Sequence, residues 1–155
     1  MSPQINIYTD GAAKGNPGPG GYGIIMQSGP HYKEISGGFR MTTNNRMELL
    51  SVIIALETLK FAGSKVTIYS DSRYVVDAIE KGWIKGWIKK NWKQVKNPDL
   101  WKRYLQASAH HQVNFVWIRG HNGHAMNERC DELAVAASHA RDLEVDAWYE
   151  ANRDS

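Results

Sequence analysis

The spacing of the apolar residues changes near residue 43, and this change restricts the fold more than any other feature of the chain. Before it, β-rich segments at 5–10, 21–27 and 32–40 are joined by short turns, which predicts an antiparallel meander. After it, helical spacing alternates with strands expected at 65–70 and 113–118. This order predicts one α/β domain with a mixed five-stranded sheet, antiparallel in its first three strands and parallel afterwards, flanked by helices.

Helices are expected at about 44–60, 72–80, 98–110 and 127–140. The first carries one apolar stripe, with Leu49, Val52, Ile53 and Leu56 at helical spacing. Thr42, Thr43 and Asn44 are its candidate N-caps. The last repeats the stripe with Cys130, Leu133, Ala134 and Ala137. No repeat or linker divides the chain, so we expect one domain over 1–141 and an acidic tail over 142–155.

Size and composition restrict where the protein works. With 155 residues and 42% hydrophobic content, the chain can bury a single core. It has no apolar run of about 18 residues, so no membrane span is expected. Met1–Gln4 lacks the basic and apolar parts of a signal peptide, and Cys130 has no partner for an internal disulfide. These features favour a cytoplasmic protein.

The net charge of +3 conceals a concentrated basic segment over residues 81–96. This segment has six lysines and no acid, so the rest of the chain carries −3. Lysines alternate with tryptophans, a pattern that suits phosphate contacts and stacking. Trp83, Ile84, Trp87 and Ile88 also have helical spacing, which is typical of packing, and a basic amphipathic helix can lie on a membrane surface. We expect most tryptophans to pack and several lysines, Lys85, Lys89 and Lys90 among them, to contact phosphates.

Four carboxylates lie where regular elements are expected to begin or end. Asp10 and Asp71 follow apolar strands, and Glu48 and Asp131 lie in the first turns of helices, at the margin of the buried face. A single acid at a helix start is ordinarily explained by the helix dipole. Four at one end of a sheet repel one another unless cations neutralise them, and hard divalent ions prefer such oxygen ligands. The pattern therefore predicts a metal site.

Five short runs, in unbroken order between about residues 4 and 140, strongly resemble bacterial ribonuclease HI, of the type 1 ribonuclease H family. They are Tyr8–Gly11, Thr42–Glu48, Tyr69–Ser72, Gly120–His124 and Asn127–Ala134. The resemblance implies an endonuclease that hydrolyses the RNA strand of RNA–DNA hybrids and leaves 5′-phosphate and 3′-hydroxyl ends. It implies two Mg²⁺ ions as cofactors, with Mn²⁺ able to substitute, and two ions about 4 Å apart suit this chemistry. A monomer without membrane partners is expected.

The resemblance also assigns residues. Asp10, Glu48, Asp71 and Asp131 match the metal-binding carboxylates, and His121 matches the catalytic-loop histidine, whose imidazole can carry a proton or assist product departure. The substrate contacts implied are Gly11, Asn16, Thr43, Asn44, Asn45 and Asn97, with Lys85, Lys89 and Lys90 in the basic protrusion at about 81–96. Asn44 and Asn45 are expected at base edges in the minor groove, and Thr43 and Asn97 at a DNA-strand phosphate.

The sequence departs from the family's pattern at Met41, where many relatives carry arginine. Arg40 lies one place earlier, and whether it substitutes is left open.

The same residues are also compatible with other functions. The protein could bind hybrids without cleaving them, or act on DNA as a nuclease or transferase of the same fold. His121 could be a solvated loop residue, or a zinc ligand with His124 and Cys130, although a second cysteine is missing. Cys130 falls on an apolar stripe, which predicts a buried thiol instead of a nucleophile.

A glycine run from Gly18 to Gly23 has the spacing of a dinucleotide-binding fingerprint. Because it contains Pro19 and leads into a strand, it does not fit that function, and we assign these glycines to a turn.

Overall fold

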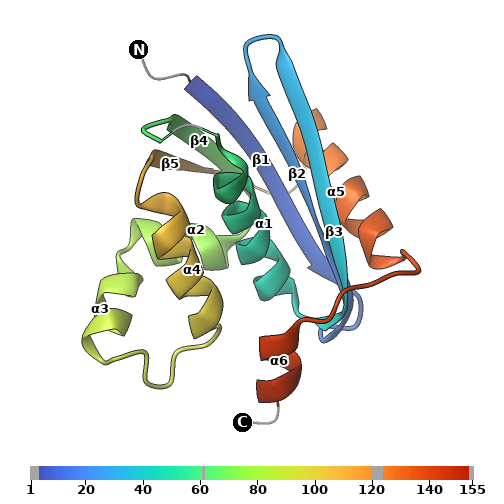
Figure 1. Ribbon diagram of the computed structural model, residues 1–155, viewed down its shortest axis with the longest axis vertical. Coiled ribbons are helices and arrows are strands. Elements are labelled where there is room, and N and C mark those ends of the chain that lie inside the picture. The colour runs from blue at the N-terminus through green and yellow to red at the C-terminus, as the bar shows by residue number, and fades with distance from the viewer. Residues whose placement is uncertain (1–3, 61, 120–123, 154–155) are drawn as a thin grey trace.

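The computed structural model describes residues 4–60, 62–119 and 124–153. Five strands form one sheet in the order β3-β2-β1-β4-β5 (Figure 1). They are β1 Gln4–Ala13, β2 Gly18–Ser28, β3 His31–Thr42, β4 Lys65–Ser70 and β5 Gln112–Trp117. The pairs β1–β2 and β2–β3 are antiparallel, and β1–β4 and β4–β5 are parallel. The predicted mixed sheet is confirmed.

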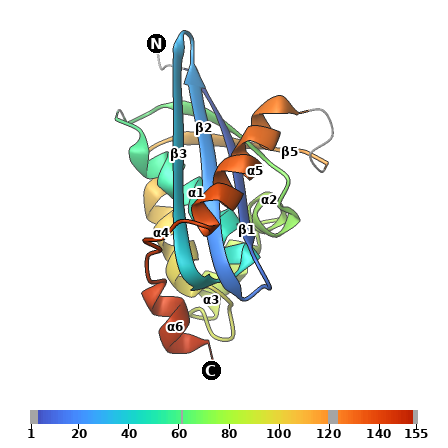
Figure 2. The same cartoon turned by 90° about the vertical axis from the view of Figure 1, so that its right-hand side faces the viewer.

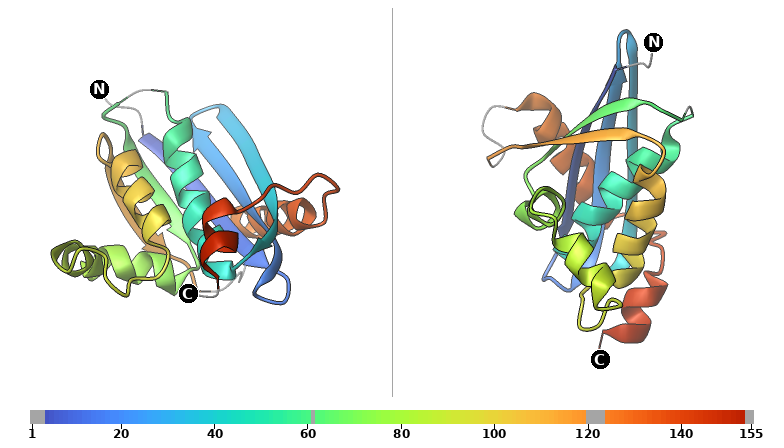
Figure 3. Two further views of the ribbon diagram at one scale, coloured as in Figure 1. Left: turned by 60° about the horizontal axis from the view of Figure 1, so that its bottom comes forward. Right: turned by 90° about the vertical axis from the view of Figure 1, so that its left-hand side faces the viewer.

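Helices cover both faces of the sheet. They are α1 Asn44–Thr58, α2 Arg73–Glu80, α3 Trp83–Lys89, α4 Pro98–Ser108, α5 Ala125–Ser138 and α6 Ala147–Asn152. Helices α1 and α4 lie on one face and α5 on the other (Figure 2). Helix α6, which the sequence did not predict, lies near the end of β3 and the start of α1 (Figure 3). In the described part of the chain, no helix is long and apolar enough to cross a membrane.

Helix α1 is enclosed, and the prediction of a single apolar stripe for it was wrong. Only Asn45 and Glu57 are exposed along the helix, and even Arg46 and Ser51 are buried. The reason is that α1 packs on β1 and β2 on one side and on α4 on another. A helix covered on several sides buries residues around most of its circumference. This central position fixes the side chains at its N-terminal end.

The glycine run has a different role from the expected turn. Gly18, Gly20, Gly21 and Gly23 lie inside β2, and α5 packs directly over this part of the strand. A Cβ atom on Gly21 would lie 2.3 Å from the Ala134 oxygen, and one on Gly23 would lie 2.2 Å from the Cys130 oxygen. Any side chain there would push α5 away from the sheet. These glycines therefore let α5 approach closely, which sets the position of Asp131 on that helix.

Candidate active site

Asp10 lies within β1, whereas the sequence predicted it to close the strand. Pairing between β1 and β4 stops at Tyr8 and Tyr69, but pairing between β1 and β2 continues to Ala13. The strand continues because its antiparallel partner does, while β4 ends at Ser70. Asp71 follows directly. Asp10 and Asp71 thus lie side by side at the carboxyl end of the parallel pair, where α/β sheets place ligands.

Three carboxylates converge at this end of the sheet. Asp10, Glu48 and Asp71 each offer one oxygen, and these oxygens lie within 4.8 Å of one another. The backbone N–H of Gly11 donates to Asp10 Oδ1 at 3.0 Å and to Glu48 Oε1 at 3.2 Å. Glu48 Oε2 is buried and accepts no hydrogen bond from the described residues. An unpartnered carboxylate oxygen among like charges is a ready ligand for a cation.

The electrostatics of this cluster oppose three simultaneous negative charges. Burial raises the pKa of Glu48 well above its usual range, and the neighbouring charges of Asp10 and Asp71 raise it further. Bound divalent cations would reverse this effect because they stabilise the ionised carboxylates. A donor set made of carboxylate oxygens suits Mg²⁺ or Mn²⁺ better than softer metals. The residues present therefore fit a divalent-metal site.

The fourth predicted carboxylate, Asp131, lines the same cleft but does not belong to the group of three close oxygens. Asp131 is half-buried on α5 and lines the cleft that contains Asp10, Glu48 and Asp71. We call this cleft, of about 440 Å³, the acidic cleft. His121 lies outside the described residues, so its predicted role stays a prediction. His124 is exposed immediately before α5.

Cys130 is a buried thiol, as predicted. Burial raises its pKa to about 12, and the charge of Asp10 adds to this effect. Its Sγ lies 3.2 Å from the Tyr8 carbonyl oxygen, to which the thiol donates. A thiol that stays protonated in a closed position cannot act as a nucleophile near neutral pH.

Asparagines connect the acidic cleft to its surroundings. Asn44 Oδ1 accepts the N–H of Ala13, and the Asn44 N–H donates to Asn16 Oδ1 at 3.0 Å. These bonds tie the β1–β2 connection, which contains a cis Asn16–Pro17 peptide bond, to the start of α1. Asn45 is exposed and lines both the acidic cleft and a second cleft beside it. A ligand that spans the two clefts therefore passes over Asn45.

The second cleft, of about 510 Å³, lies between the start of α1 and α6, and we call it the C-terminal cleft. Its lining includes the predicted substrate residues Asn16, Thr43, Asn45 and Asn97, together with Lys96. Its other lining residues on the C-terminal side are Trp148, Tyr149, Asn152 and Arg153. Sequence reasoning missed these four, and the aromatic pair after Asp146 was the only available signal.

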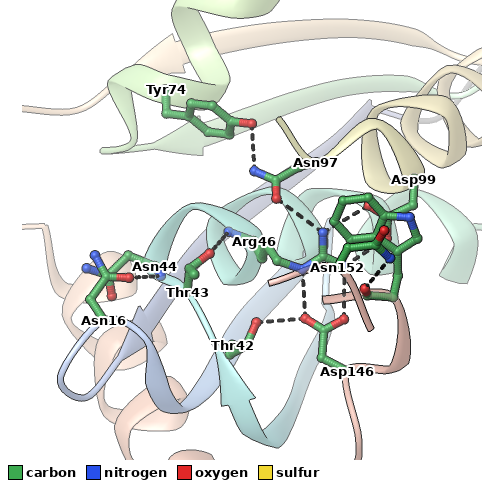
Figure 4. A network of polar contacts seen from close by, with 11 residues as sticks. Asn16, Thr42, Thr43, Asn44, Arg46, Tyr74, Asn97, Asp99, Asp146 and Asn152 are labelled. Atoms are coloured by element: carbon green, nitrogen blue, oxygen red, sulfur yellow. Dashed lines mark hydrogen bonds and ion pairs between the residues drawn. The ribbon is translucent and has the colours of Figure 1, made fainter. Parts of the chain in front are cut away.

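Two of the predicted substrate residues in the C-terminal cleft are held by hydrogen bonds (Figure 4). Thr43 is the N-cap of α1, and its Oγ1 accepts the Arg46 N–H at 3.2 Å. Asn97 has a left-handed backbone with φ of 57°, and its amide nitrogen donates to the Tyr74 hydroxyl at 3.0 Å. These bonds orient both side chains before any ligand arrives.

The basic segment is a short helix with an irregular continuation, and it projects from the edge of the molecule (Figure 1). All six lysines between 81 and 96 are exposed. The Trp87 ring lies 5.3 Å from that of buried Trp101 and 6.5 Å from that of Trp92, centroid to centroid. The expectation that most tryptophans pack is confirmed for Trp87 and Trp92, whereas Trp83 is 44% exposed.

Known proteins share both the sequence and the fold. Residues 2–139 match the family model for RNase H. A ribonuclease H of Trichodesmium erythraeum is 54% identical over 152 residues, which cover 95% of this chain and 96% of the relative. LC9-RNase H1, described as a type 1 RNase H with the type 2 active-site motif, aligns with a TM-score of 0.81 and 30% identity over 99% of this chain and 82% of that one. LC11-RNase H1, solved in complex with an RNA/DNA hybrid, aligns with a TM-score of 0.65 and 29% identity over 86% of this chain and 95% of that one.

The mixed sheet, its helices and the carboxylates at its end define a hydrolytic nuclease of the α/β class. Within that class, the chain belongs to the ribonuclease H family.

Proposed function

We propose that this protein hydrolyses the RNA strand of RNA–DNA hybrids at the acidic cleft, using two divalent ions, Mg²⁺ by preference. The observation that carries the proposal is the convergence of Asp10, Glu48 and Asp71 within 4.8 Å, with Glu48 Oε2 buried and unpartnered among the described residues. Binding a polyanion does not require such a cluster, because negative side chains repel phosphates. The cluster therefore favours catalysis over simple hybrid binding.

The carboxylates of the chain would position the divalent ions, and the ions would supply positive charge at the reacting phosphate. Two bound divalent ions would supply the charge that activates the attacking water and stabilises the attacking and leaving oxygens. Water would add to phosphorus and the P–O3′ bond would break, which leaves 5′-phosphate and 3′-hydroxyl ends. Asp10, Glu48 and Asp71 would hold them, and Asp131 would add a ligand from the rim of the cleft. We assign His121 to proton transfer or to departure of the product.

Recognition of the hybrid would extend over both clefts. Asn45 lies exposed at their boundary, where an amide can reach base edges and 2′-hydroxyls in a wide minor groove. Thr43 and Asn97 offer donors to a phosphate of the DNA strand in the C-terminal cleft. The exposed lysines of α3, Lys85 and Lys89, and Lys90 beyond it would neutralise further phosphates.

Cleavage of matched duplexes tests the proposal. End-labelled RNA–DNA, RNA–RNA and DNA–DNA duplexes of one sequence are incubated with Mg²⁺, Mn²⁺ or EDTA, and the product ends are identified by their response to phosphatase and ligase. We expect Mg²⁺-dependent cleavage of RNA in the hybrid alone, retained in Glu80→Gln, which removes an exposed acid of α2, and lost in Glu48→Gln. Binding without cleavage, or cleavage of DNA–DNA, would reject the proposal in favour of a binding module or a DNA-acting enzyme.

A further inference from the structure

Helix α6 does not hold its own position. It has six residues, and none of them is buried. Before it, Glu144 pairs with the end of β3: the Arg40 N–H donates to the Glu144 oxygen at 2.9 Å, and the Glu144 N–H donates to the Gly38 oxygen at 3.0 Å. An isolated helix this short is not stable in water. Contacts from other elements must therefore place α6 beside the C-terminal cleft.

Arg46 provides the main contact (Figure 4). Its side chain is 2% exposed, and all five of its N–H groups are used. Nε and Nη2 donate to Asp146 at 2.7 and 2.9 Å, Nη1 and Nη2 donate to Asp99 at 2.9 and 2.7 Å, and Nη1 also donates to Asn97 at 3.2 Å. Burial opposes the charged guanidinium, but these carboxylates outweigh that effect and raise its pKa. One side chain thus connects the start of α1, the start of α4 and the residue before α6.

A second arginine holds the other end of α6. Arg40 donates from Nε to Glu150 Oε2 at 2.9 Å and from Nη2 to Glu150 Oε1 at 2.8 Å. This bidentate pair engages the Arg40 guanidinium with α6. Together the two arginines neutralise Asp146 and Glu150. Residues 142–153 are acidic in sequence, yet these two acids form ion pairs with arginines of β3 and α1.

The side of this segment that faces the C-terminal cleft has a different character. Tyr149, Asn152 and Arg153 line the cleft, and Lys96 lines it from the chain before α4. No acidic residue occurs among the described residues that line it. Two cations and several neutral donors around one cleft suit an anion. The cleft adjoins the acidic cleft through Asn45, so a duplex held at the carboxylates would carry its backbone across it.

We propose that α6 is part of the nucleic-acid-binding surface and that Arg153, with Lys96, binds a backbone phosphate of the duplex in the C-terminal cleft. This proposal rests on the proposed function. Arg153 supplies a positive charge beside the neutral donors Asn16, Thr43 and Asn97. Arg46 and Arg40 act as positioning residues, because they hold α6 through ion pairs and do not line the C-terminal cleft.

Salt dependence of hybrid binding tests the proposal. Arg153→Ala and Arg153→Lys are compared with Arg141→Ala, which removes an exposed arginine of the same region that does not line the cleft. All are made in an Asp10→Asn background, so that the hybrid stays intact. We expect Arg153→Ala to weaken binding several-fold and to reduce the log–log salt slope by somewhat under one unit. Arg153→Lys should retain the salt slope of the Asp10→Asn background, and Arg141→Ala should match that background in both affinity and slope.

Kinetics of the active protein supply the second measurement. Because a phosphate contact away from the carboxylates binds ground and transition states alike, Arg153→Ala should raise KM several-fold and leave kcat within about twofold. A slope and KM for Arg153→Ala equal to those of Arg141→Ala would overturn the proposal and leave α6 a structural support. If the unmodified protein neither binds nor cleaves hybrids, the proposed function itself fails, which is a distinguishable result.

Discussion

Gly11 brings two carboxylates of the acidic cleft together. Its N–H donates to both Asp10 and Glu48, and a Cβ atom there would lie 2.4 Å from the backbone of Met47 and Glu48. Glycine therefore allows the start of α1 to approach β1 closely, which places Glu48 beside Asp10. Close backbone contact thus brings carboxylates of like charge together, and repulsion between them opposes their simultaneous ionisation.

Asp10→Asn tests that repulsion. We expect the variant to lose hybrid cleavage, since one ligand oxygen becomes an amide. In EDTA it should melt at the same temperature as wild type or higher, because removing one charge relieves the buried Glu48. Thermal melts in EDTA and cleavage assays in Mg²⁺ measure the two effects. A variant with near-wild-type Mg²⁺-dependent cleavage would remove Asp10 from the site.

His121→Ala tests the role assigned to the catalytic-loop histidine. General acid–base assistance contributes typically about 10²–10⁴-fold, so we expect a partial loss of kcat. The affinity for the hybrid should change little. Steady-state kinetics between pH 6 and 9 provide the measurement, with His124→Ala as the matched control. If kcat is unchanged across this range, His121 is a solvated residue.

At the scale of elements, the helices differ in what they contribute. Helix α1 is buried on several sides, α5 packs against glycines of β2, and α3 lies at the edge with its lysines exposed. In addition, Arg129 on α5 forms a bidentate pair with Glu34 of β3, at 2.9 and 3.1 Å. Substitutions in α3 should therefore affect binding, and substitutions in the contact between α5 and β3 should affect stability.

Replacing Lys85, Lys89 and Lys90 together with alanine tests α3 and the residue after it. We expect KM to rise more than kcat falls, because these lysines are remote from the carboxylates and bind ground and transition states alike. The salt slope of hybrid binding should decrease by up to about 0.9 for each lost phosphate contact. Lys33, Lys60 and Lys65, exposed at the opposite end of the sheet, form the matched triple control. Identical slopes for the two triple variants would make the lysines of the basic segment a solvated face.

Glu34→Gln tests the contact between β3 and α5 through its pH dependence. Hydrogen bonds from Arg129 and then Tyr32 lower the pKa of Glu34 to about 2. Folding thus favours the charged form, so this stabilisation is present above about pH 4.5 and is lost as the pH falls toward 2. Because the pair is exposed, we expect the variant to melt only about 1–3 °C lower at pH 7. The difference should shrink at pH 3, whereas a difference independent of pH would contradict the ionic origin.

At the scale of the whole molecule, Arg46 connects parts of the chain that are far apart in sequence. Asp99 and Asp146 lie 53 and 100 residues from it, and the guanidinium also lies 5.0 Å from the Trp148 ring. Residues 142–153 are therefore held against the body of the protein, and their two engaged acids are matched to arginines. These contacts hold α6 beside the C-terminal cleft, which residues of α6 line.

Asp146→Asn tests this connection. The variant removes one of the two negative charges that neutralise the buried Arg46 guanidinium. Breaking a buried ion pair typically costs about 3 kcal/mol of folding stability. For a chain of this size, that corresponds to a decrease of roughly 6–12 °C in Tm. Glu150→Gln, which breaks the exposed pair with Arg40, is the control and should have a much smaller effect. Stability is measured by urea and thermal unfolding. If Asp146→Asn and Glu150→Gln lower it by the same small amount, Arg46 does not stabilise the docked segment.

Short-range patterns in the sequence were sufficient for the fold class. The change from alternating to helical spacing predicted the order of the elements, because each strand or helix buries one face with its own local period. The five motifs indicated the ribonuclease H family. The sequence predicted one cluster of four carboxylates, and the structure brings Asp10, Glu48 and Asp71 within 4.8 Å while Asp131 lines the same cleft. The roles of Asp131, His121 and the substrate residues stay predictions for the experiments above.

Other features depended on contacts that no local pattern contains. The burial of α1 on several sides, the close approach of α5 to Gly21 and Gly23, and the pairing of Arg40 with Glu150 each join segments distant in sequence. Asp146 and Glu150 have the sequence pattern of a charged tail, because their partners, Arg46 and Arg40, are about 100 residues away. By itself, the amino-acid sequence determined the strands, the helices other than α6, the family and the candidate metal ligands, since these follow from local spacing and motifs. Only the tertiary structure decided which charges are neutralised and which side chains line the C-terminal cleft, since burial and ion pairing are properties of the packed chain.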